Sequence, residues 1–527
     1  MTKNKLNLYI NTLKHLRFKQ VYYRLFYFIR NKVQKKNNYH IPLKRKLAVL
    51  HWKNHILNRD TYIEKNKFSF LNQTHQFDKT IDWNYIDFGK LWAYNLNYFD
   101  FLNQENISKE IGLGLINDFI DQKEKLAEGI EPYPISLRGI NWIKFLSLHQ
   151  IIDKKINQYL YDDYQNLLNN LEYHLLGNHL LENAYSLFFA AYHFKDDILY
   201  RKAKNLLTSE LSEQILKDGA HYELSPMYHQ ILFQRLLDSI NLVQLNQWKE
   251  DNFVVFLKEK ASLMVSWLQE ITYKNGSIPM VNDSAFDIAV SSNELFDYAN
   301  HIGIQNLSIP LSESGYRKYN TDSYEFFFDV GNMQPSYQPG HAHADTFNFE
   351  LFVNERPIVV DTGVSTYEKN ERRQKERGTA AHNTVIVNDK NQSQVWGGFR
   401  VAKRAKVIKL VESKKLIEAT HDGYKNIGVL HTRKVVFDKQ SITISDTISN
   451  KIMLKQTSII HFHPSVQNIL IDTDTINLIN EGITIHFTNA KNIKLEKYKY
   501  AKGFNKRLVA YKINIYFSES LKMKISI

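Results

Sequence analysis

Residues 160–175, LYDDYQNLLNNLEYHL, place apolar side chains at intervals of three and four residues. This spacing gives one buried face on an α-helix. Similar patterns recur up to about residue 300 and are separated by short turns such as Lys217-Asp218-Gly219 and Lys274-Asn275-Gly276. The N-terminal half is therefore predicted to be a succession of antiparallel helical hairpins. The repeated patterns lie around residues 109–120, 138–152, 183–195, 228–246 and 253–272.

After about residue 310 the apolar period becomes two. Apolar residues alternate with polar ones in 347–351, and again near 442–444, 483–487 and 513–515. Because strand pattern follows strand pattern without helices between, we expect an antiparallel β region. The turn signals between the strands are Asn388-Asp389, Asp438-Lys439, Glu481-Gly482 and Lys502-Gly503. The chain is thus predicted to be an α+β multidomain protein, divided into residues 1–50 (a basic, aromatic extension), 51–305 (helical) and 306–527 (antiparallel β).

Composition limits the chemistry and the partners. The 527 residues contain no cysteine, which excludes disulfides, thiolate metal sites and a cysteine nucleophile. The formal net charge of +13 favours a polyanion such as acidic polysaccharide, anionic lipid or nucleic acid, although a lysine-rich solvated surface explains it equally well. No nucleic-acid recognition motif accompanies the charge, so nucleic acid is not an expected partner.

The N-terminus does not have the pattern of a signal peptide. Basic residues interrupt it from Lys3 to Arg30, so no apolar h-region forms. We therefore expect a cytoplasmic or membrane-peripheral protein, with the periplasm left open. The aromatic and basic segment Phe18 to Lys36 could rest on a membrane surface, or it could be a helix packed on the body of the protein.

The β half contains a concentration of metal-binding residue types. His341 and His343 stand two residues apart before a strand pattern, so both side chains should point the same way. Asp361 ends the next apolar run and His382 opens another. Adjacent strand ends could bring His343, Asp361 and His382 together, with His341 left over for proton chemistry. Unrelated polar residues at strand ends are the ordinary alternative.

Three motifs in the helical half could carry chemistry. Asn178, His179 and Glu182 would share one surface at a helix junction, where an amide and an imidazole can hydrogen-bond a carboxylate. Ser225-Pro226 should start a helix with Tyr228 in its first turn. At another helix start, one face carries Arg138 and Asn141, which could bind a carboxylate or pair with a nearby aspartate. Helix caps and core contacts explain each motif equally well.

Together these residues resemble the heparinase II/III superfamily of polysaccharide lyases, which includes alginate lyases. The resemblance rests on Asn178-His179 and Tyr228 in the helical half and on Gly340-His341-Ala342-His343, Asp361 and His382-Asn383-Thr384 in the β half. The run Gln394-Val395-Trp396-Gly397-Gly398-Phe399-Arg400 also resembles bacterial members found among polysaccharide-synthesis genes. It implies an N-terminal incomplete α/α toroid and a C-terminal antiparallel β-sandwich-like domain with a substrate cleft between them.

The resemblance also implies roles for individual residues. Zinc, structural in this family, would be held by His343, Asp361 and His382. The catalytic positions would be Asn178, His179, Tyr228 and His341, and the substrate contacts Arg138, Asn141, Glu182 and Tyr367. A lyase of this kind removes the C5 proton of a uronate and expels the 4-linked sugar. Tyr228 and His341 would share the acid and base roles, while Asn178 and His179 would neutralise the carboxylate.

The leading hypothesis is thus a β-eliminating lyase that acts on an anionic, uronate-containing polysaccharide. Two alternatives stay open: a non-catalytic polysaccharide-binding or assembly factor with the same fold, and a zinc-dependent hydrolase that uses the histidine cluster.

Overall fold

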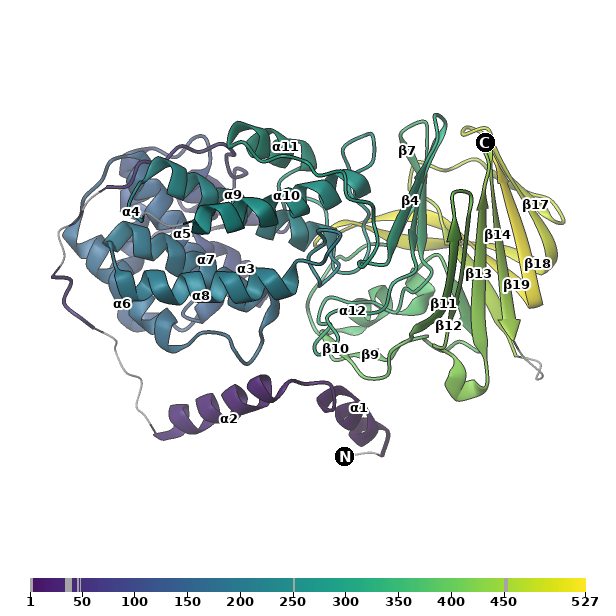
Figure 1. The fold of residues 1–527 in the computed structure, drawn as a ribbon, viewed down its shortest axis with the longest axis horizontal. Helices are drawn as coiled ribbons and strands as arrows, with labels where there is room; N and C mark the ends of the chain where they lie inside the picture. The colour runs from purple at the N-terminus through teal and green to yellow at the C-terminus, as the bar shows by residue number, and fades with distance from the viewer. Residues whose placement is uncertain (1–2, 34–39, 45–46, 48, 250–251, 450–453) are drawn as a thin grey trace.

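The structure, a computed structural model, describes residues 3–33, 40–44, 47, 49–249, 252–449 and 454–527. A helical region and a β region lie side by side, and two N-terminal helices run beneath both (Figure 1). Within the described residues, no helix combines the length and apolar character that crossing a bilayer requires.

The helical region is a set of packed hairpins around one apolar core. Its buried residues form a continuous cluster that includes Trp92, Trp142, Tyr185, Phe233 and Trp267. This confirms the helical reading of the N-terminal half. The helices are α3 (Lys90–Tyr98), α4 (Lys109–Asp121), α5 (Pro132–Leu148), α6 (Lys154–Asn169), α7 (Gly177–Phe194), α8 (Asp197–Gln214), α9 (Pro226–Leu245), α10 (Phe253–Ile271) and α11 (Ser292–His301).

The helix predicted to continue through residue 175 ends earlier. α6 stops at Asn169, because the side-chain amides of Asn169 and Asn170 bond the carbonyls of Gln165 and Asn166 at 2.7 and 2.8 Å. Such bonds satisfy carbonyls that the end of a helix leaves free. The following residues turn the chain, and α7 begins at Gly177. The break places Asn178 at a helix N-terminus rather than in the middle of a helix.

A small sheet in the helical half has no counterpart in the sequence prediction. Its strands are β1 (Tyr62–Glu64), β2 (Lys67–Phe70) and β3 (Gln73–Gln76), all antiparallel. Tight hairpins join them, with positive φ at Lys65-Asn66 and Leu71-Asn72. The strands are too short for a periodic signal. The sheet also contacts the β region, since Asn72 Nδ2 donates to the carbonyl of Phe504 at 2.9 Å.

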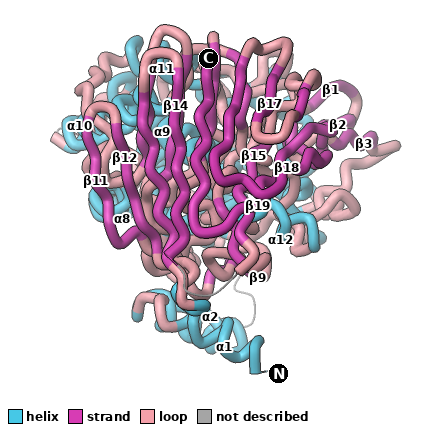
Figure 2. The backbone as a smooth tube through the Cα atoms, turned by 90° about the vertical axis from the view of Figure 1, so that its right-hand side faces the viewer, coloured by secondary structure: helices cyan, strands magenta, loops and turns pink. Residues whose placement is uncertain are grey.

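The β region consists of two antiparallel sheets that share one core. The smaller sheet has the order β4-β5-β6-β7. The larger sheet faces the viewer in Figure 2 and has the path β11-β12-β13-β14-β19-β18-β17-β16, with β15 joining β19 to β8. Every residue of β13 alternates between buried and partly exposed, as expected for a strand with one covered face.

The strand bounds agree with the predicted turns. Asp438-Lys439, Glu481-Gly482 and Lys502-Gly503 lie in or beside hairpin turns, and Asn388-Asp389 follows β8. The strands are β4 (Tyr316–Asn320), β5 (Tyr324–Asp329), β6 (Phe349–Val353), β7 (Arg356–Val359), β8 (Val385–Val387), β9 (Val395–Trp396), β10 (Arg400–Val401), β11 (Val407–Ser413), β12 (Leu416–His421), β13 (Leu430–Phe437), β14 (Ser441–Ser449), β15 (Gln456–His461), β16 (Ile469–Ile471), β17 (Thr475–Leu478), β18 (Ile483–Gly503) and β19 (Lys506–Ser526). One short helix, α12 (Glu371–Glu376), interrupts the β half.

The N-terminal extension begins with two helices, α1 (Lys3–Leu13) and α2 (Phe18–Val33). One side of α2 packs on the helical region. Tyr27 Oη donates to the carbonyl of Leu171 at 2.5 Å, and the ring of Tyr23 stacks on Tyr173. The predicted helix packed on the body is therefore present. Residues 34–36 of the predicted segment lie outside the described residues.

Candidate active site between the helical and β regions

The buried carboxylate of Asp283 is the centre of the site. It lies in the loop after α10 and accepts both Nη atoms of Arg373 at 2.5 and 2.6 Å. It also binds His341 Nδ1 and His343 Nε2, each at 2.9 Å. Burial alone would raise the pKa of this carboxyl, but Arg373 and the two histidines hold it well below its usual range. The carboxylate is therefore ionised and fixes three cationic or proton-donating groups.

The loop that carries the two histidines is aligned against the Asp283 loop by backbone bonds. Asp283 N donates to the carbonyl of His341 at 3.1 Å, and His343 N donates to Asn282 Oδ1 at 3.0 Å. Both imidazoles consequently reach the same carboxylate, so the prediction that they point the same way is confirmed.

His341 joins this centre to the helical region. Since its Nδ1 faces the carboxylate of Asp283, the hydrogen-bond network assigns the proton to Nδ1 and the lone pair to Nε2. Nε2 lies 3.3 Å from Asn178 Nδ2, which also donates to Glu223 Oε2 at 3.1 Å. Asn178 is in turn held by its backbone N–H, which donates to Glu223 Oε1 at 3.1 Å. The result is an unprotonated imidazole nitrogen beside a fixed amide.

Tyr228 lies against His341 from the first turn of α9. The centres of the two rings are 4.1 Å apart. Ser225 caps the helix, as predicted, and accepts the backbone N–H of Tyr228 at 3.3 Å. Burial raises the pKa of the Tyr228 phenol, and a hydrogen bond with Tyr367 offsets only part of that rise. The phenol is therefore protonated at neutral pH.

His179 lies next to Asn178 but has a different partner. Its Nδ1 lies 3.0 Å from Glu172 Oε1, and the other oxygen of Glu172 accepts Asn183 Nδ2 at 3.0 Å. Burial lowers the pKa of His179, but Glu172 and the carboxylates beyond it raise it by more, so the net shift is upward. The side chain is 39% exposed. It can therefore present a positive charge to an anion in the cleft.

The predicted metal ligands form two separate hydrogen-bonded groups. His382 Nδ1 lies 2.7 Å from Asp361 Oδ2, while His343 is bonded to Asp283. The oxygens of Asp361 also accept Asn348 Nδ2 and Gly363 N. The buried nitrogens His343 Nδ1 and His382 Nε2 have no protein partner. Nevertheless, the described residues contain no group of three His, Cys, Asp or Glu side chains that could hold a metal. Zinc stays a prediction from the resemblance, and no chemical step below depends on it.

Two predicted substrate contacts are wrong, because their side chains are committed to the core. Arg138 is 1% exposed and bonds Asp163 Oδ2 at 2.7 Å and the carbonyl of Gly129 at 2.8 Å. Asn141 is fully buried and donates to the carbonyl of Tyr98 at 2.9 Å. Both lie on α5, which is buried nearly all round, so a face inferred from sequence spacing does not reach the cleft.

Glu182 does not share a surface with Asn178 and His179. It is fully buried, and its nearest printed cation is Arg235 Nε at 3.5 Å. Burial raises its pKa to about 7 despite Arg235. A direct substrate contact is therefore wrong for Glu182 as well. Tyr367, by contrast, lies beside Tyr228 and His341, where a substrate contact remains a prediction.

Sequence reasoning missed the residues that organise the site. Asp283, Arg373, Glu223 and Glu172 lie in loops or at helix ends without a distinctive motif. Only the Asn282-Asp283-Ser284 run, a polar break after an apolar segment, hints at a loop. Their function depends on segments that meet from Glu172 to Arg373, a separation that no local pattern records.

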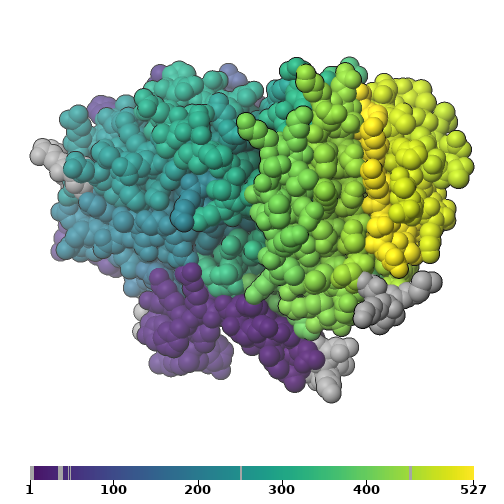
Figure 3. Space-filling model, turned by 45° about the vertical axis from the view of Figure 1, so that its right-hand side comes forward, coloured from purple at the N-terminus to yellow at the C-terminus, as the bar shows by residue number. Residues whose placement is uncertain are grey.

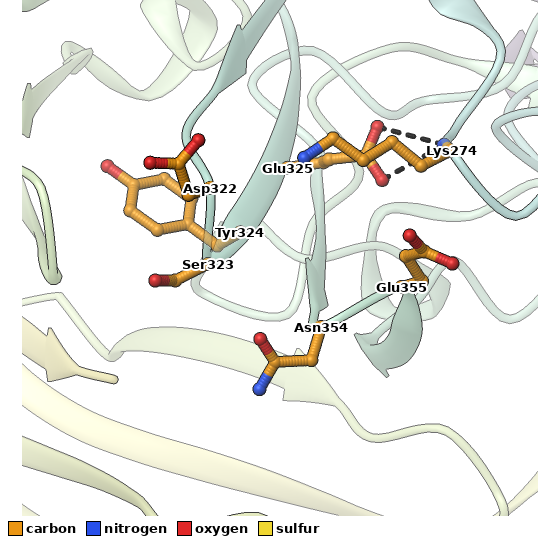
Figure 4. Close-up of a pocket in the computed structure, with 7 residues that line it drawn as sticks. All are labelled: Lys274, Asp322, Ser323, Tyr324, Glu325, Asn354 and Glu355. Carbon is orange, nitrogen blue, oxygen red and sulfur yellow. Dashed lines mark hydrogen bonds between the residues drawn. The ribbon is translucent and has the colours of Figure 1, made fainter.

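A small pocket elsewhere has no part in this arrangement. It has a volume of about 210 Å³ and lies at the β4–β5 turn. Figure 4 shows its residues, in which both oxygens of Glu325 accept the backbone N–H of Lys274. None of the predicted site residues lines it.

The chain matches known families over most of its length. Residues 135–302 match the heparinase II/III N-terminus, and residues 305–527 match the heparinase II/III-like C-terminal domain. The chain belongs to the heparinase II/III family. Heparin-sulfate lyases from Bacteroides stercoris and Pedobacter heparinus are each 26% identical to it, over 302 and 294 residues. Those matches cover 50% of this chain but only 42% of each relative.

Solved structures share the fold. A crystal structure of heparinase III aligns with a TM-score of 0.63 at 15% identity, covering 98% of this chain and 91% of that chain. The heparan sulfate lyase of Pedobacter heparinus aligns with a TM-score of 0.54 at 18% identity, covering 88% and 80%. The predicted fold class, an incomplete α/α toroid followed by an antiparallel β-sandwich-like domain, is confirmed.

Proposed function

We propose that this protein is a polysaccharide lyase that cleaves an anionic, uronate-containing polysaccharide by β-elimination. One observation carries the proposal. Between the two domains, the unprotonated Nε2 of His341, the amide of Asn178 and the protonated phenol of Tyr228 lie together. These are the base, carboxylate-stabilising and acid groups that the reaction needs. The names of the related heparin-sulfate lyases support the same reaction class.

Each residue has a role that follows from its surroundings. Asn178 and the positively charged form of His179 would neutralise the uronate carboxylate, which makes the C5 proton more acidic. The C5–H bond breaks as the proton moves to His341 Nε2, and its electron pair forms the C4–C5 double bond. The bond between C4 and the bridging oxygen breaks, and that oxygen takes the Tyr228 proton. Solvent then removes the proton from His341 and returns one to Tyr228.

Asp283 acts through His341. It holds the Nδ1–H tautomer and favours the imidazolium that forms when Nε2 takes the proton. Arg373 fixes the carboxylate in turn, so neither residue needs to touch the substrate. They are positioning residues.

A panel of uronate polymers tests the proposal. We expect the protein to release a product with the ultraviolet absorbance of an unsaturated uronate from at least one polymer. Tyr228→Phe should abolish this signal without changing the melting temperature. Tyr319→Phe, at a half-buried tyrosine of β4, is the matched control and should keep full activity. Full activity in Tyr228→Phe would refute the assignment.

The same panel separates the alternatives. New reducing ends without unsaturation would indicate a hydrolase. Binding across the panel without cleavage would indicate a polysaccharide-binding or assembly factor.

A further inference from the structure

The two N-terminal helices connect both domains at one end of the cleft. Figure 3 shows them crossing beneath the boundary between the helical and β regions. α2 packs on the helical side, as described above. α1 contacts the β side, where the Tyr9 ring packs edge-on against Trp396 at 4.8 Å and Trp396 Nε1 donates to Thr12 Oγ1 at 3.1 Å.

A pocket of about 320 Å³ lies between these helices and the β region. Its far wall is formed by residues 337–339, which lead directly into Gly340-His341, and by residues 396–404. Phe399 belongs to this wall, and its ring centre lies 6.1 Å from that of His341 and 5.3 Å from that of Tyr367. The pocket therefore adjoins the catalytic residues.

Three arginines line the pocket, and no carboxylate lines it. Arg24 bonds Gln338 Oε1 at 3.2 Å, Arg400 lies 3.5 Å from the Tyr9 hydroxyl, and Arg404 bonds the carbonyl of Ser336. Among the described residues, none of the three forms an ion pair. Burial lowers the pKa of Arg404 to about 10, and its Nε is buried without a partner. Converging guanidinium groups without a counter-charge are unfavourable unless an anion is bound.

We propose that this pocket is a subsite for the oxyanion groups, sulfate or carboxylate, of the polysaccharide chain, and that α1 and α2 complete that end of the cleft. Guanidinium groups bind such oxyanions in a bidentate way. The exposed face of Phe399, which is 40% accessible, offers a surface for a sugar ring between the pocket and His341. The proposal rests on the proposed lyase function.

Binding by a protein that cannot turn over tests the subsite. In a Tyr228→Phe background, calorimetry would measure the affinity for hexasaccharides and disaccharides of heparan sulfate and of alginate. Arg400→Gln/Arg404→Gln should weaken hexasaccharide binding about tenfold and flatten its salt dependence, while disaccharide binding stays unchanged. Lys506→Gln/Arg507→Gln, at exposed residues of β19, removes the same charge and should have no effect. Loss confined to the heparan sulfate arm identifies sulfate, and loss in both arms identifies carboxylate.

The outcomes also separate the subsite from the reaction. Equal hexasaccharide affinity in parent and arginine variants overturns the subsite alone. Arginine-dependent binding without cleavage of any polymer by the unmodified protein supports the subsite and overturns the lyase function. Inorganic sulfate, followed by Trp396 fluorescence with Trp396→Phe as control, probes the pocket without a saccharide. No response to sulfate and no saccharide binding together overturn the subsite.

The outer surface of the same helices supports a second proposal. It exposes large apolar side chains to an unusual degree; Phe18 is 84% exposed, Leu25 59% and Phe28 58%. The other exposed apolar residues of the two helices are Leu6, Ile10, Leu13, Val21, Tyr22, Phe26, Ile29 and Val33. A helix pair packed on one side and apolar on the other requires a further partner.

Charge identifies the chemistry of that partner. The first 59 residues hold 15 of the 68 lysines and arginines and none of the 55 acidic residues. The remaining residues, 60–527, therefore have a net charge of −2. The basic character of the whole protein thus lies in this segment. Apolar side chains flanked only by cationic ones are typical of helices that lie in the surface of an anionic membrane.

We propose that the outer face of α1 and α2 docks on an anionic lipid surface. Co-sedimentation with vesicles of phosphatidylcholine alone, and of phosphatidylcholine with phosphatidylglycerol, tests this. The protein should bind the anionic vesicles, and Leu25→Gln/Phe28→Gln should weaken that binding about tenfold or more. Leu470→Gln/Ile471→Gln, at exposed apolar residues of β16, should bind as the parent does. Absence of vesicle binding, equal binding by all variants, or a dimer in solution that the helix variant abolishes would overturn the proposal.

Discussion

Replacing Asp283 with asparagine should affect both stability and catalysis. The carboxylate is fully buried and holds two bonds from Arg373 and one from each of His341 and His343. Asp283→Asn keeps the shape but removes the charge, which leaves the 1% exposed Arg373 without a counter-ion. Breaking a buried ion pair in this way costs about 3–5 kcal/mol. We therefore expect the free energy of unfolding to fall by about that amount.

The catalytic loss has a separate cause. An asparagine amide can offer an N–H to Nδ1 of His341, which would move the ring proton to Nε2. The nitrogen that should accept the C5 proton would then be blocked. Loss of the correct tautomer in other histidine–aspartate pairs lowers kcat by roughly 10³–10⁴. The assay is formation of unsaturated uronate, measured where Asp283→Asn remains folded.

A double-mutant cycle distinguishes charge pairing from simple packing. Arg373→Met alone removes the cation, and Asp283→Asn/Arg373→Met removes both charges. If the pair is the source of the cost, the double variant should be less destabilised than the sum of the single variants by at least about 1 kcal/mol. Additive effects in urea unfolding, or wild-type kcat in folded Asp283→Asn, would refute the reasoning.

Three further predictions follow from the structure. Glu182 has a pKa of about 7 in the folded protein, above the ordinary 4.5, so its protonation favours folding at low pH and this contribution is lost as pH rises through about 7. Glu182→Gln should remove roughly 2–3 kcal/mol of the decline in unfolding free energy between about pH 5 and pH 8; urea melts with the same pH slope as the parent would contradict this. Arg138→Met should destabilise the protein by about 3–5 kcal/mol and leave KM unchanged, because Arg138 pairs with Asp163 in the core; a raised KM at unchanged stability would instead restore its predicted substrate contact. Zinc is tested by elemental analysis: we expect about one ion per chain, removed by His343→Ala with a drop in melting temperature, and metal-free protein of full stability would rule it out.

The sequence by itself determined the fold class and the candidate residues of the reaction. Apolar periods of 3.6 and 2 are properties of neighbouring residues, so the change from helix to antiparallel strand was visible without any tertiary contact. His341, Asn178 and Tyr228 were identified in the same way, from motifs shared with a family. A local pattern also has limits. The same periodicity extended α6 through residue 175, because it does not record the side-chain amides of Asn169 and Asn170 that end the helix.

Only the tertiary structure decided which candidates act together. α5 is enclosed on nearly all sides, so Arg138 and Asn141 became core residues although their spacing suited a surface face. Asp283 had no motif, yet it became the centre of the site because packing brings three distant segments to one carboxylate. Spacing along a chain fixes which side chains share a face of one element. Whether that face meets solvent, a cleft or another buried charge depends on where the other elements pack.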